Sequence, residues 1–451
     1  MNLHKGIKYS KLSSQGSGSI SPSLYSLPGL HDITRVELSN GIVILARSNF
    51  YSPSIVVSGY LMAGSISDSD EKLGLADFTS TALMRGTVNR NFQQIFDTLE
   101  SVGANLGFEG GLHTTGFWGR SLVEDLDMLL ELLAETLRQP TFPLEHVERL
   151  RAQLLTGLSI RAQSTGDMAS MAFDELVYAN HPYRRPEDGY LETVERITSE
   201  DLAAFHSNHY GPRGMTIAIV GAVDPQQAVD KVSRIFEGWH NPNQPLPSGL
   251  PPLTSLDNVK RCQIEIPGKF QADILVGVTG PSRQSPDFMA ANLGNSILGQ
   301  FGMMGRVGAI VREKEGLAYY AHSNLGGGMG PGPWTVAAGV APQNIERAVS
   351  LILQEISRFV KEPVSQEELS NSQANFIGRL PLSLESNSGV ASALVNLERY
   401  KLGLDYYQRY PGLVKAISPD EILQVASRYL DPQRIAIAIA GPKMDDQISG
   451  G

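Results

Sequence analysis

The chain repeats one of its own segments 220 residues further along, and this repeat limits the folds that are open to it. Ile197-Thr-Ser-Glu-Asp-Leu aligns with Ile417-Ser-Pro-Asp-Glu-Ile, and the same offset pairs Gly221 with Gly441 without a gap. Each copy is typical of an N-capped helix, a proline turn and a terminal apolar strand. One register that holds through a helix, a turn and a strand predicts two similar domains, each with a sheet covered by helices. We therefore expect an α+β fold in two tandem copies.

Composition indicates where one copy ends and the next begins. Residues 240–260 are crowded with proline, asparagine, glycine and serine, which is typical of a linker. We expect an N-terminal domain over 31–239 and a C-terminal domain over 261–451. Residues 1–30 are rich in serine, contain no acid and lack the apolar core of a secretory signal, so we expect a flexible extension there. An organelle transit peptide is the alternative for this extension, although it lacks arginine.

Charge and hydropathy argue against two classes of partner. The net charge of −10 argues against nucleic acid, because phosphate binding needs a concentrated basic face. The longest apolar runs, such as 215–223, are too short to cross a bilayer.

The only cysteine, Cys262, cannot form a disulfide within the chain, which fits a reducing compartment. We expect a cytoplasmic protein, with an organelle stroma or matrix as the alternative.

A second constraint lies in the segment from Gly74 to Thr87, which is typical of a buried helix ended by a glycine. Asp77, Ser80 and Thr81 stand three and four residues apart, so their side chains share one face of this helix. One class of zinc peptidases places a ligand, a general base and a second ligand at this spacing, as H-x-x-E-H. Here the spacing is kept, but two of the three groups are neutral hydroxyls that cannot act as a base near pH 7. We expect local hydrogen bonds and packing instead of a catalytic zinc, which needs about three protein ligands.

Taken together, several segments resemble the pitrilysin/insulinase, or inverzincin, metallopeptidases. The segments that carry the resemblance are Gly74 to Thr81 with Gly86-Thr87, His181-Pro182-Tyr183 with Arg185-Pro186, Leu298 to Gly305, and Val311-Arg-Glu-Lys-Glu-Gly-Leu-Ala-Tyr319. The resemblance covers roughly residues 31–445. It points to the non-catalytic subunits of the family, of the mitochondrial processing peptidase alpha type and of the bacterial heterodimeric peptidases.

The resemblance implies a LuxS/metallopeptidase-like fold with mostly antiparallel sheets, and two such chains that close around a peptide chamber. Active members carry two zinc-binding histidines and a glutamate base on the helix, with a further glutamate ligand some seventy-odd residues on. Carried over by position, Asp77, Ser80 and Thr81 replace the first histidine, the glutamate and the second histidine. Residues 150–174 contain no glutamate to act as the distal ligand. We therefore expect a degenerate motif that binds no metal, and zinc in a partner chain that carries H-x-x-E-H.

The same resemblance gives the C-terminal copy a role in catalysis. Arg312 and Tyr319 match an arginine and a tyrosine that complete the zinc site of the opposing chain, and Tyr320 leaves a choice of tyrosine. A guanidinium and a phenol can hydrogen-bond the substrate backbone and the carbonyl that gains charge during hydrolysis. The alternative is an ordinary junction, with Arg312 in a surface ion pair with Glu313 or Glu315 and Tyr319 in the core.

Three glycines, Gly299, Gly302 and Gly305, resemble the glycine-rich segment that substrate-handling subunits present to the chamber. They do not form a phosphate loop, because the G-K-[ST] ending is missing.

The sequence thus predicts a non-catalytic subunit of a heterodimeric zinc metallopeptidase. It would be inactive alone, form half of a peptide chamber, and donate Arg312 and Tyr319 to its partner for hydrolysis of peptides or presequences. The alternative is a scaffold subunit, like the respiratory-complex core proteins, with no part in catalysis. The peptide, the partner and the choice between homodimer and heterodimer stay open.

Overall fold

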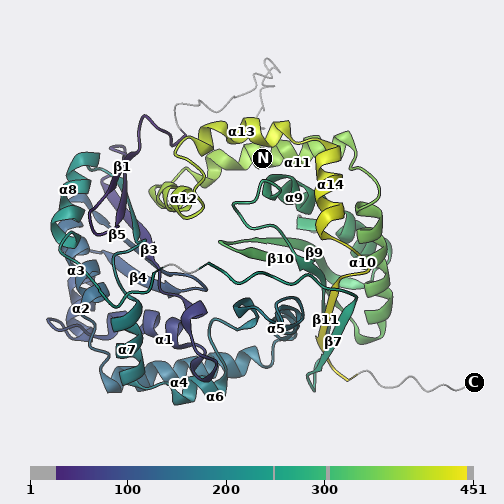
Figure 1. Cartoon of the computed structure of the whole chain (residues 1–451), viewed down its shortest axis with the longest axis horizontal. Coiled ribbons are helices and arrows are strands. Elements are labelled where there is room, and N and C mark those ends of the chain that lie inside the picture. Colours follow the sequence, from purple (N-terminus) through teal and green to yellow (C-terminus); the bar gives the residue numbers. More distant parts are fainter. Residues whose placement is uncertain (1–26, 247–248, 301–304, 444–451) are drawn as a thin grey trace, which may run out of the picture.

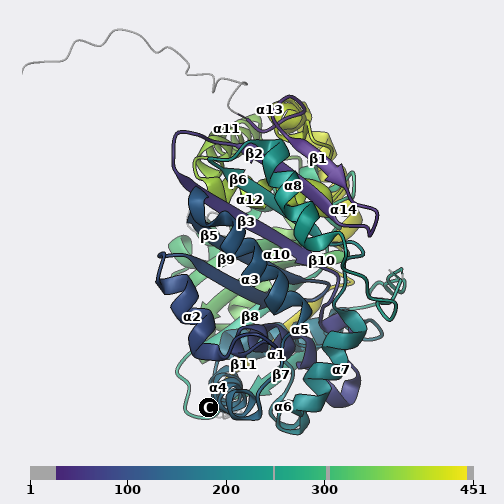
Figure 2. The same ribbon diagram turned by 90° about the vertical axis from the view of Figure 1, so that its left-hand side faces the viewer.

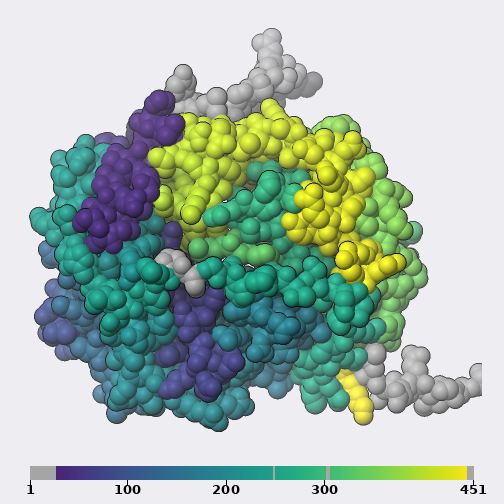
Figure 3. Space-filling model, in the orientation of Figure 1, coloured from purple at the N-terminus to yellow at the C-terminus, as the bar shows by residue number. Residues whose placement is uncertain are grey.

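The computed structural model describes residues 27–246, 249–300 and 305–443. The N-terminal half, up to residue 239, and the C-terminal half, from residue 260, each contain one sheet (Figure 1). The two sheets lie on opposite sides of the molecule in this view, and helices lie above and below the space between them. The segment that joins the halves crosses the face that Figure 3 shows, and its described residues form neither helix nor strand. The division into domains at this linker stays a prediction.

The N-terminal sheet has the order β1-β2-β6-β3-β5-β4, and all neighbours are antiparallel except β2 and β6. Its strands are β1 (Thr34–Glu37), β2 (Val43–Ser48), β3 (Ser54–Leu61), β4 (Asn105–Gly110), β5 (Thr115–Leu122) and β6 (Thr216–Gly221). All six residues of β6 are buried, which suits its place inside the sheet. Strand β4 forms one edge, so one side of its backbone has no neighbour within this sheet.

Figure 2 shows α3 (Leu126–Arg138) and α8 (Pro225–Phe236) in front of the outer face of this sheet. The other helices that share its core are α1 (Leu75–Ala82), α2 (Phe92–Glu100), α4 (Leu144–Arg161), α6 (Leu191–Arg196) and α7 (Ser199–His209). Helix α2 begins with the capping box that Asn91 makes with Gln94. The segment from Gly74 to Thr87, predicted as one helix, is α1 followed by a 3₁₀ turn at Leu83–Arg85 before Gly86.

The C-terminal sheet has the order β7-β11-β8-β10-β9, with β7 and β11 parallel and the rest antiparallel. Its strands are β7 (Lys260–Glu265), β8 (Ala272–Thr279), β9 (Ala318–Gly327), β10 (Pro331–Val340) and β11 (Ala436–Gly441). Its helices are α9 (Phe288–Asn295), α10 (Ile345–Phe359), α11 (Gln366–Ser383), α13 (Tyr406–Ala416) and α14 (Pro419–Tyr429), with π-helical turns at Ser296–Gln300 (η7) and Gly308–Lys314 (η9).

The predicted repeat is confirmed. Helix α14 repeats α7, and β11 repeats β6, with the same lengths at the predicted offset. In each copy the strand runs parallel to one neighbour and antiparallel to the other. The α+β fold with two mostly antiparallel sheets is confirmed as well.

Each half contributes one helix that packs on the inner face of the other half's sheet. Helix α5 (Thr165–Val177) belongs to the N-terminal half, yet its Phe173 and Val177 pack with Ala436 and Ala438 of β11. Figure 1 shows α5 beside β11 and β7. Phe173 is 1% exposed, so α5 and β11 bury apolar surface together and α5 covers part of the inner face of the C-terminal sheet.

Helix α12 (Asn387–Arg399) makes the reciprocal contact with the N-terminal sheet. Its Val390 and Leu394 pack with Leu45 of β2 and Val220 of β6. The Asn387 Nδ2 atom also donates to the carbonyl oxygen of Ser54, 3.2 Å away. The two halves therefore interlock, since separating them would expose apolar surface on both sheets.

Among the described residues, no helix combines the length and the apolar character needed to cross a bilayer. The predicted extension falls outside the described residues as far as residue 26, and Gly302 of the glycine-rich segment also falls outside them.

Candidate functional site

Helix α1 begins at a turn that a buried carboxylate holds in place. Gly74 precedes the helix with a φ of 92°, in the left-handed region that favours glycine. Asp68 accepts hydrogen bonds from the backbone N–H groups of Gly74 and Ala76, both at 3.0 Å. Phe78 and Ala82 are fully buried and fix the helix against the sheet. The polar face of α1 is thereby held in one orientation.

The two hydroxyls on that face bond within the helix itself. Ser80 Oγ donates to the carbonyl oxygen of Asp77 at 2.8 Å, and Thr81 Oγ1 donates to that of Phe78 at 2.9 Å. Hydroxyls with these short-range partners are common in helices. The hydroxyl protons of Ser80 and Thr81 are therefore used in hydrogen bonds within the helix, as expected from the sequence.

Strand β4 lies directly against the same face of α1. A Cβ atom added to Gly110 of β4 would stand 2.7 Å from both Cα and Oδ1 of Asp77 and 3.0 Å from Ser80 Oγ. Only glycine allows so close an approach between a strand backbone and a helix. The space beside Asp77 and Ser80 is therefore largely filled by the edge strand.

Asp77 lies in an acidic environment that the motif alone did not reveal. Burial, with smaller contributions from the negative charges of Asp188 and Glu109, raises the pKa of its carboxyl to about 6. Glu109 comes from β4, while Asp188 comes from the loop before α6. The only signal in the sequence is the acidic pair Glu187-Asp188, which follows the His181-Pro182-Tyr183 segment.

The donor groups at this site do not fit a catalytic zinc. Asp77 is the only metal-binding side chain among the three motif positions, and no group of three or more His, Cys, Asp or Glu side chains within the described residues is arranged to hold a metal ion. In the region of the distal ligand, Asp167 is exposed, and burial raises the pKa of Asp174 to about 7. No chemical step can therefore be assigned to a metal held by these residues.

His206 and His209, three residues apart at the end of α7, contact backbone and aromatic groups of their own half. His206 Nε2 lies 2.9 Å from the carbonyl oxygen of Leu137, and burial lowers the pKa of the imidazole. His209 stacks on Phe205 with ring centroids 4.4 Å apart. Neither His206 nor His209 belongs to a group of potential metal ligands in the described part of the chain.

We expect Asp77→Asn to flatten the pH dependence of stability. A carboxyl whose pKa rises on folding stabilises the folded state below its ordinary pKa near 4, and this contribution is lost as the pH rises through about 6. Between pH 4 and pH 7 the free energy of unfolding of the wild type should fall by about 1–2 kcal/mol more than that of the variant. Urea unfolding at both pH values measures the difference.

The matched control for this test is Asp167→Asn, which neutralises an exposed carboxylate. This control should follow the wild-type pH profile. Equal profiles for Asp77→Asn and the wild type would contradict the raised pKa of Asp77.

Arg312 and Tyr319 both lie at the surface of the C-terminal half. Arg312 is an exposed residue of η9, and Tyr319 is 64% exposed at the start of the edge strand β9. The alternative that places Tyr319 in the core is therefore wrong. Glu315 pairs with Arg347 at 3.1 Å, and no ion pair between Arg312 and a described carboxylate is found.

Tyr320 differs from its neighbour in both exposure and bonding. Its Oη donates to Asp273 Oδ1 at 2.5 Å, and burial raises its pKa. Successive residues of a strand point to opposite faces, so Tyr319 and Tyr320 cannot serve the same site.

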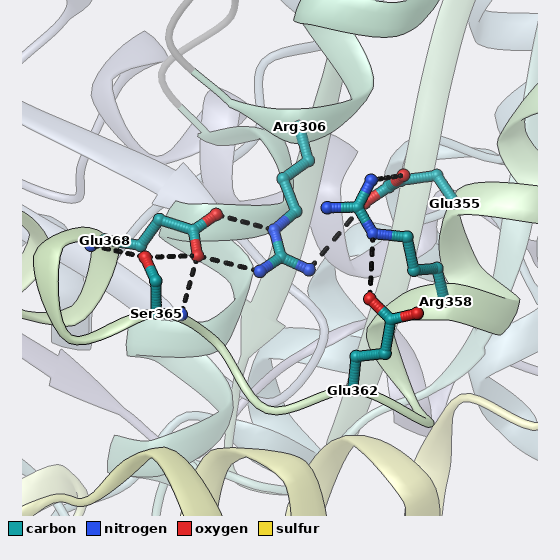
Figure 4. Close-up of polar contacts among 6 residues, drawn as sticks. All are labelled: Arg306, Glu355, Arg358, Glu362, Ser365 and Glu368. Atoms are coloured by element: carbon teal, nitrogen blue, oxygen red, sulfur yellow. Dashed lines mark hydrogen bonds and ion pairs between the residues drawn. The ribbon is translucent and has the colours of Figure 1, made fainter.

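The described glycines of the glycine-rich segment bring its two ends together. A Cβ atom added to Gly305 would stand 2.4 Å from Cα of Gly299, a separation at which no side chain fits. Immediately after Gly305, Arg306 anchors the chain. Its Nε and Nη2 atoms donate to the two carboxylate oxygens of Glu368 at 2.7 and 2.8 Å (Figure 4). This bidentate pair fixes one end of the segment against the start of α11.

Comparison with known protein families gives two matches that follow one another along the chain. A model described as Insulinase (Peptidase family M16) matches residues 43–186, and one described as Peptidase M16 inactive domain matches residues 196–376. Together they cover most of the chain. The first spans the α1 motif, and the second spans Arg312 and Tyr319.

Curated relatives match over nearly the whole chain. An uncharacterized zinc protease of Streptomyces coelicolor is 23% identical over 93% of this chain and 92% of its own length. A probable mitochondrial-processing peptidase subunit beta of Arabidopsis thaliana is 23% identical over 91% of this chain and 79% of its own length. The expected likeness to the alpha type in particular stays a prediction.

Solved structures show the same fold. The crystal structure of a peptidase M16 inactive domain from Pseudomonas fluorescens matches with a TM-score of 0.85 and 24% identity, over 92% of this chain and 99% of that one. A protease from Helicobacter pylori matches with a TM-score of 0.83 and 20% identity, over 92% of this chain and 100% of that one. On the two family models, which match residues 43–186 and 196–376, the chain belongs to the insulinase family of metallopeptidases, peptidase family M16.

Proposed function

We propose that this chain is the non-catalytic subunit of a heterodimeric zinc metallopeptidase. A partner chain of the same family would hold zinc on an H-x-x-E-H helix, and this chain would form half of the peptide chamber. The observation that carries the proposal is the polar face of α1, where Ser80 and Thr81 bond to backbone carbonyls and Asp77 is the only potential metal ligand among the motif positions. The family fold is kept while the donor chemistry of its zinc site is missing.

The second part of the proposal concerns the residues donated to the partner. The exposed positions of Arg312 and Tyr319 support it, because groups that complete another chain's site must be accessible before assembly. Tyr319 is the better candidate of the two tyrosines, since the hydroxyl of Tyr320 is bonded to Asp273. A guanidinium and a phenol there would stabilise the charge that develops on the carbonyl oxygen during hydrolysis.

The test mixes this chain with an H-x-x-E-H chain of the family and measures cleavage of a quenched fluorogenic peptide. We expect Arg312→Ala to lower kcat of the mixture by about 100-fold, the usual effect of removing one donor that stabilises an oxyanion. Arg347→Ala is the matched control, because Arg347 is an exposed arginine bound to Glu315 in the same region. Full activity of the Arg312→Ala mixture would contradict the donation.

The same assay separates this proposal from a scaffold role. A scaffold subunit would leave the cleavage rate of the partner unchanged whether or not it was present. A donor subunit should raise the rate, and the increase should depend on Arg312.

A further inference from the structure

We propose that the C-terminal half contains a binding pocket for a carboxylate carried beside an apolar group, such as the C-terminus of a peptide. The pocket is separate from the α1 motif and from Arg312 and Tyr319. It is a cavity of about 580 Å³ between α11, α13 and the end of α9. This volume falls in the usual range for small-molecule sites.

The charge of the cavity wall is opposite to that of the whole protein. The net charge of the chain is −10, yet the described residues that line the cavity include Arg283 and Arg379 and no aspartate or glutamate. A wall of this kind favours an anionic group, and guanidinium groups match a carboxylate with two parallel hydrogen bonds.

Arg283 is held in place by aromatic rings and not by a counter-ion. Its Nη2 atom donates to Tyr406 Oη at 2.8 Å, and its guanidinium carbon lies 4.6 Å from the ring centroid of Phe288 and 5.5 Å from that of Tyr406. No ion pair joins it to a carboxylate among the described residues. A partly buried cation without a counter-ion gains from an anionic ligand, because the ligand restores the interactions lost with water.

Phenols and apolar side chains complete the wall. Burial raises the pKa of Tyr407 and of Tyr410 to about 12, so both phenols stay protonated and can donate to an oxygen anion. Phe376 and Leu380 of α11 supply an apolar side. The arrangement suits a carboxylate whose neighbouring side chain is aromatic or aliphatic.

The basic character continues beyond this cavity. Arg283 and Tyr406 also line a neighbouring cavity of about 580 Å³, which includes Lys401 and Arg409 and again no acid among its described lining. Arg409 is paired with Asp405 at 2.7 Å. Because Asp405 balances the charge of Arg409, Lys401 is the residue that extends the positive charge of Arg283 into the adjoining cavity.

The test is fluorescence anisotropy with the isolated full-length chain. The probe is a fluorescein-labelled pentapeptide that ends in two phenylalanines with a free carboxylate. We expect at least about tenfold weaker binding when the terminus is amidated, because a charged hydrogen-bond acceptor is lost. An amidated peptide with an internal glutamate tests the second source of a carboxylate, and its binding would assign the pocket to acidic side chains.

Two substitutions locate the binding. Arg379→Gln and Arg283→Gln should each lower the affinity for the free-acid peptide by about tenfold or more. Arg149→Gln, which changes an exposed arginine of α4, should leave the affinity unchanged. If Arg283→Gln prevents folding, Arg379→Gln and the amidated peptide still show whether a carboxylate binds in this pocket. Failure of both carboxylate peptides to bind, or wild-type binding by the folded variants, would overturn the proposal.

The inference rests on the proposed function only in taking a peptide as the source of the carboxylate. Anisotropy requires neither the partner nor cleavage. If the peptide does not bind but the chain still activates its partner, the proposed pocket is wrong and the proposed donation stands. If the peptide binds but the partner is not activated, the proposed donation is wrong and the pocket stands.

Discussion

Replacing Arg306 by alanine should lower the free energy of unfolding by about 3–5 kcal/mol, the usual cost of breaking a buried ion pair. The side chain of Arg306 is 10% exposed and binds Glu368 through two hydrogen bonds. It also lies 3.8 Å from Glu355, whose side chain is only 2% exposed. Without the arginine, two partly or fully buried carboxylates would lose their shared cation.

The control for this prediction is Arg358→Ala, which removes another arginine that contacts Glu355. Arg358 pairs with Glu355 at 3.4 Å and with Glu362 at 3.3 Å, but its side chain is 49% exposed (Figure 4). Arg358→Ala should therefore cost no more than about 1 kcal/mol. Urea unfolding compares the two variants, and equal small losses would contradict the role assigned to Arg306.

The pH dependence of the same variant gives an independent check. The hydrogen bonds from Arg306 lower the pKa of Glu368 to about 2. A carboxylate with a lowered pKa stabilises the fold above its ordinary pKa near 4.5, and this contribution is lost as the pH falls toward 2. The difference between wild type and Arg306→Ala should therefore shrink between pH 5 and pH 2.

Replacing Phe173 by alanine should also cost about 3–5 kcal/mol, the usual range for a fully buried phenylalanine. Phe173 lies on α5 of the N-terminal half but packs on β11 of the C-terminal half. We therefore expect faster hydrogen exchange of the β11 amides as well as lower overall stability. Phe270→Ala is the control, because Phe270 is 91% exposed. Unchanged exchange in β11 would show that α5 is not needed to cover the C-terminal sheet.

The sequence predicted the repeated elements well because their signals are local. In each copy the capped helix, the proline turn and the apolar strand are indicated by residues within short windows. The exchange of α5 and α12 could not be predicted in this way. An apolar stripe such as that of Phe173 and Val177 shows that a helix is buried, but not which sheet it covers.

The residue types at the candidate site could be predicted from the sequence, but the residues that surround them could not. The missing zinc-site groups at Ser80 and Thr81 followed from the resemblance, by matching this helix position by position to the H-x-x-E-H helix of the family. The effect of Glu109 and Asp188 on Asp77 depends on segments far apart in the sequence, which only the fold brings together. The exposure of Tyr319 depends on what packs against its end of β9, which its own sequence does not indicate.

We propose that this chain hydrolyses no peptide by itself, and an assay of the isolated chain decides the point. The chain is purified alone, and cleavage of a quenched fluorogenic peptide is followed with added Zn²⁺ and again with EDTA. We predict no cleavage above the buffer rate in either condition, and cleavage only after an H-x-x-E-H chain is added. Peptide cleavage by the pure chain that EDTA abolishes would show that the chain holds a working zinc site of its own.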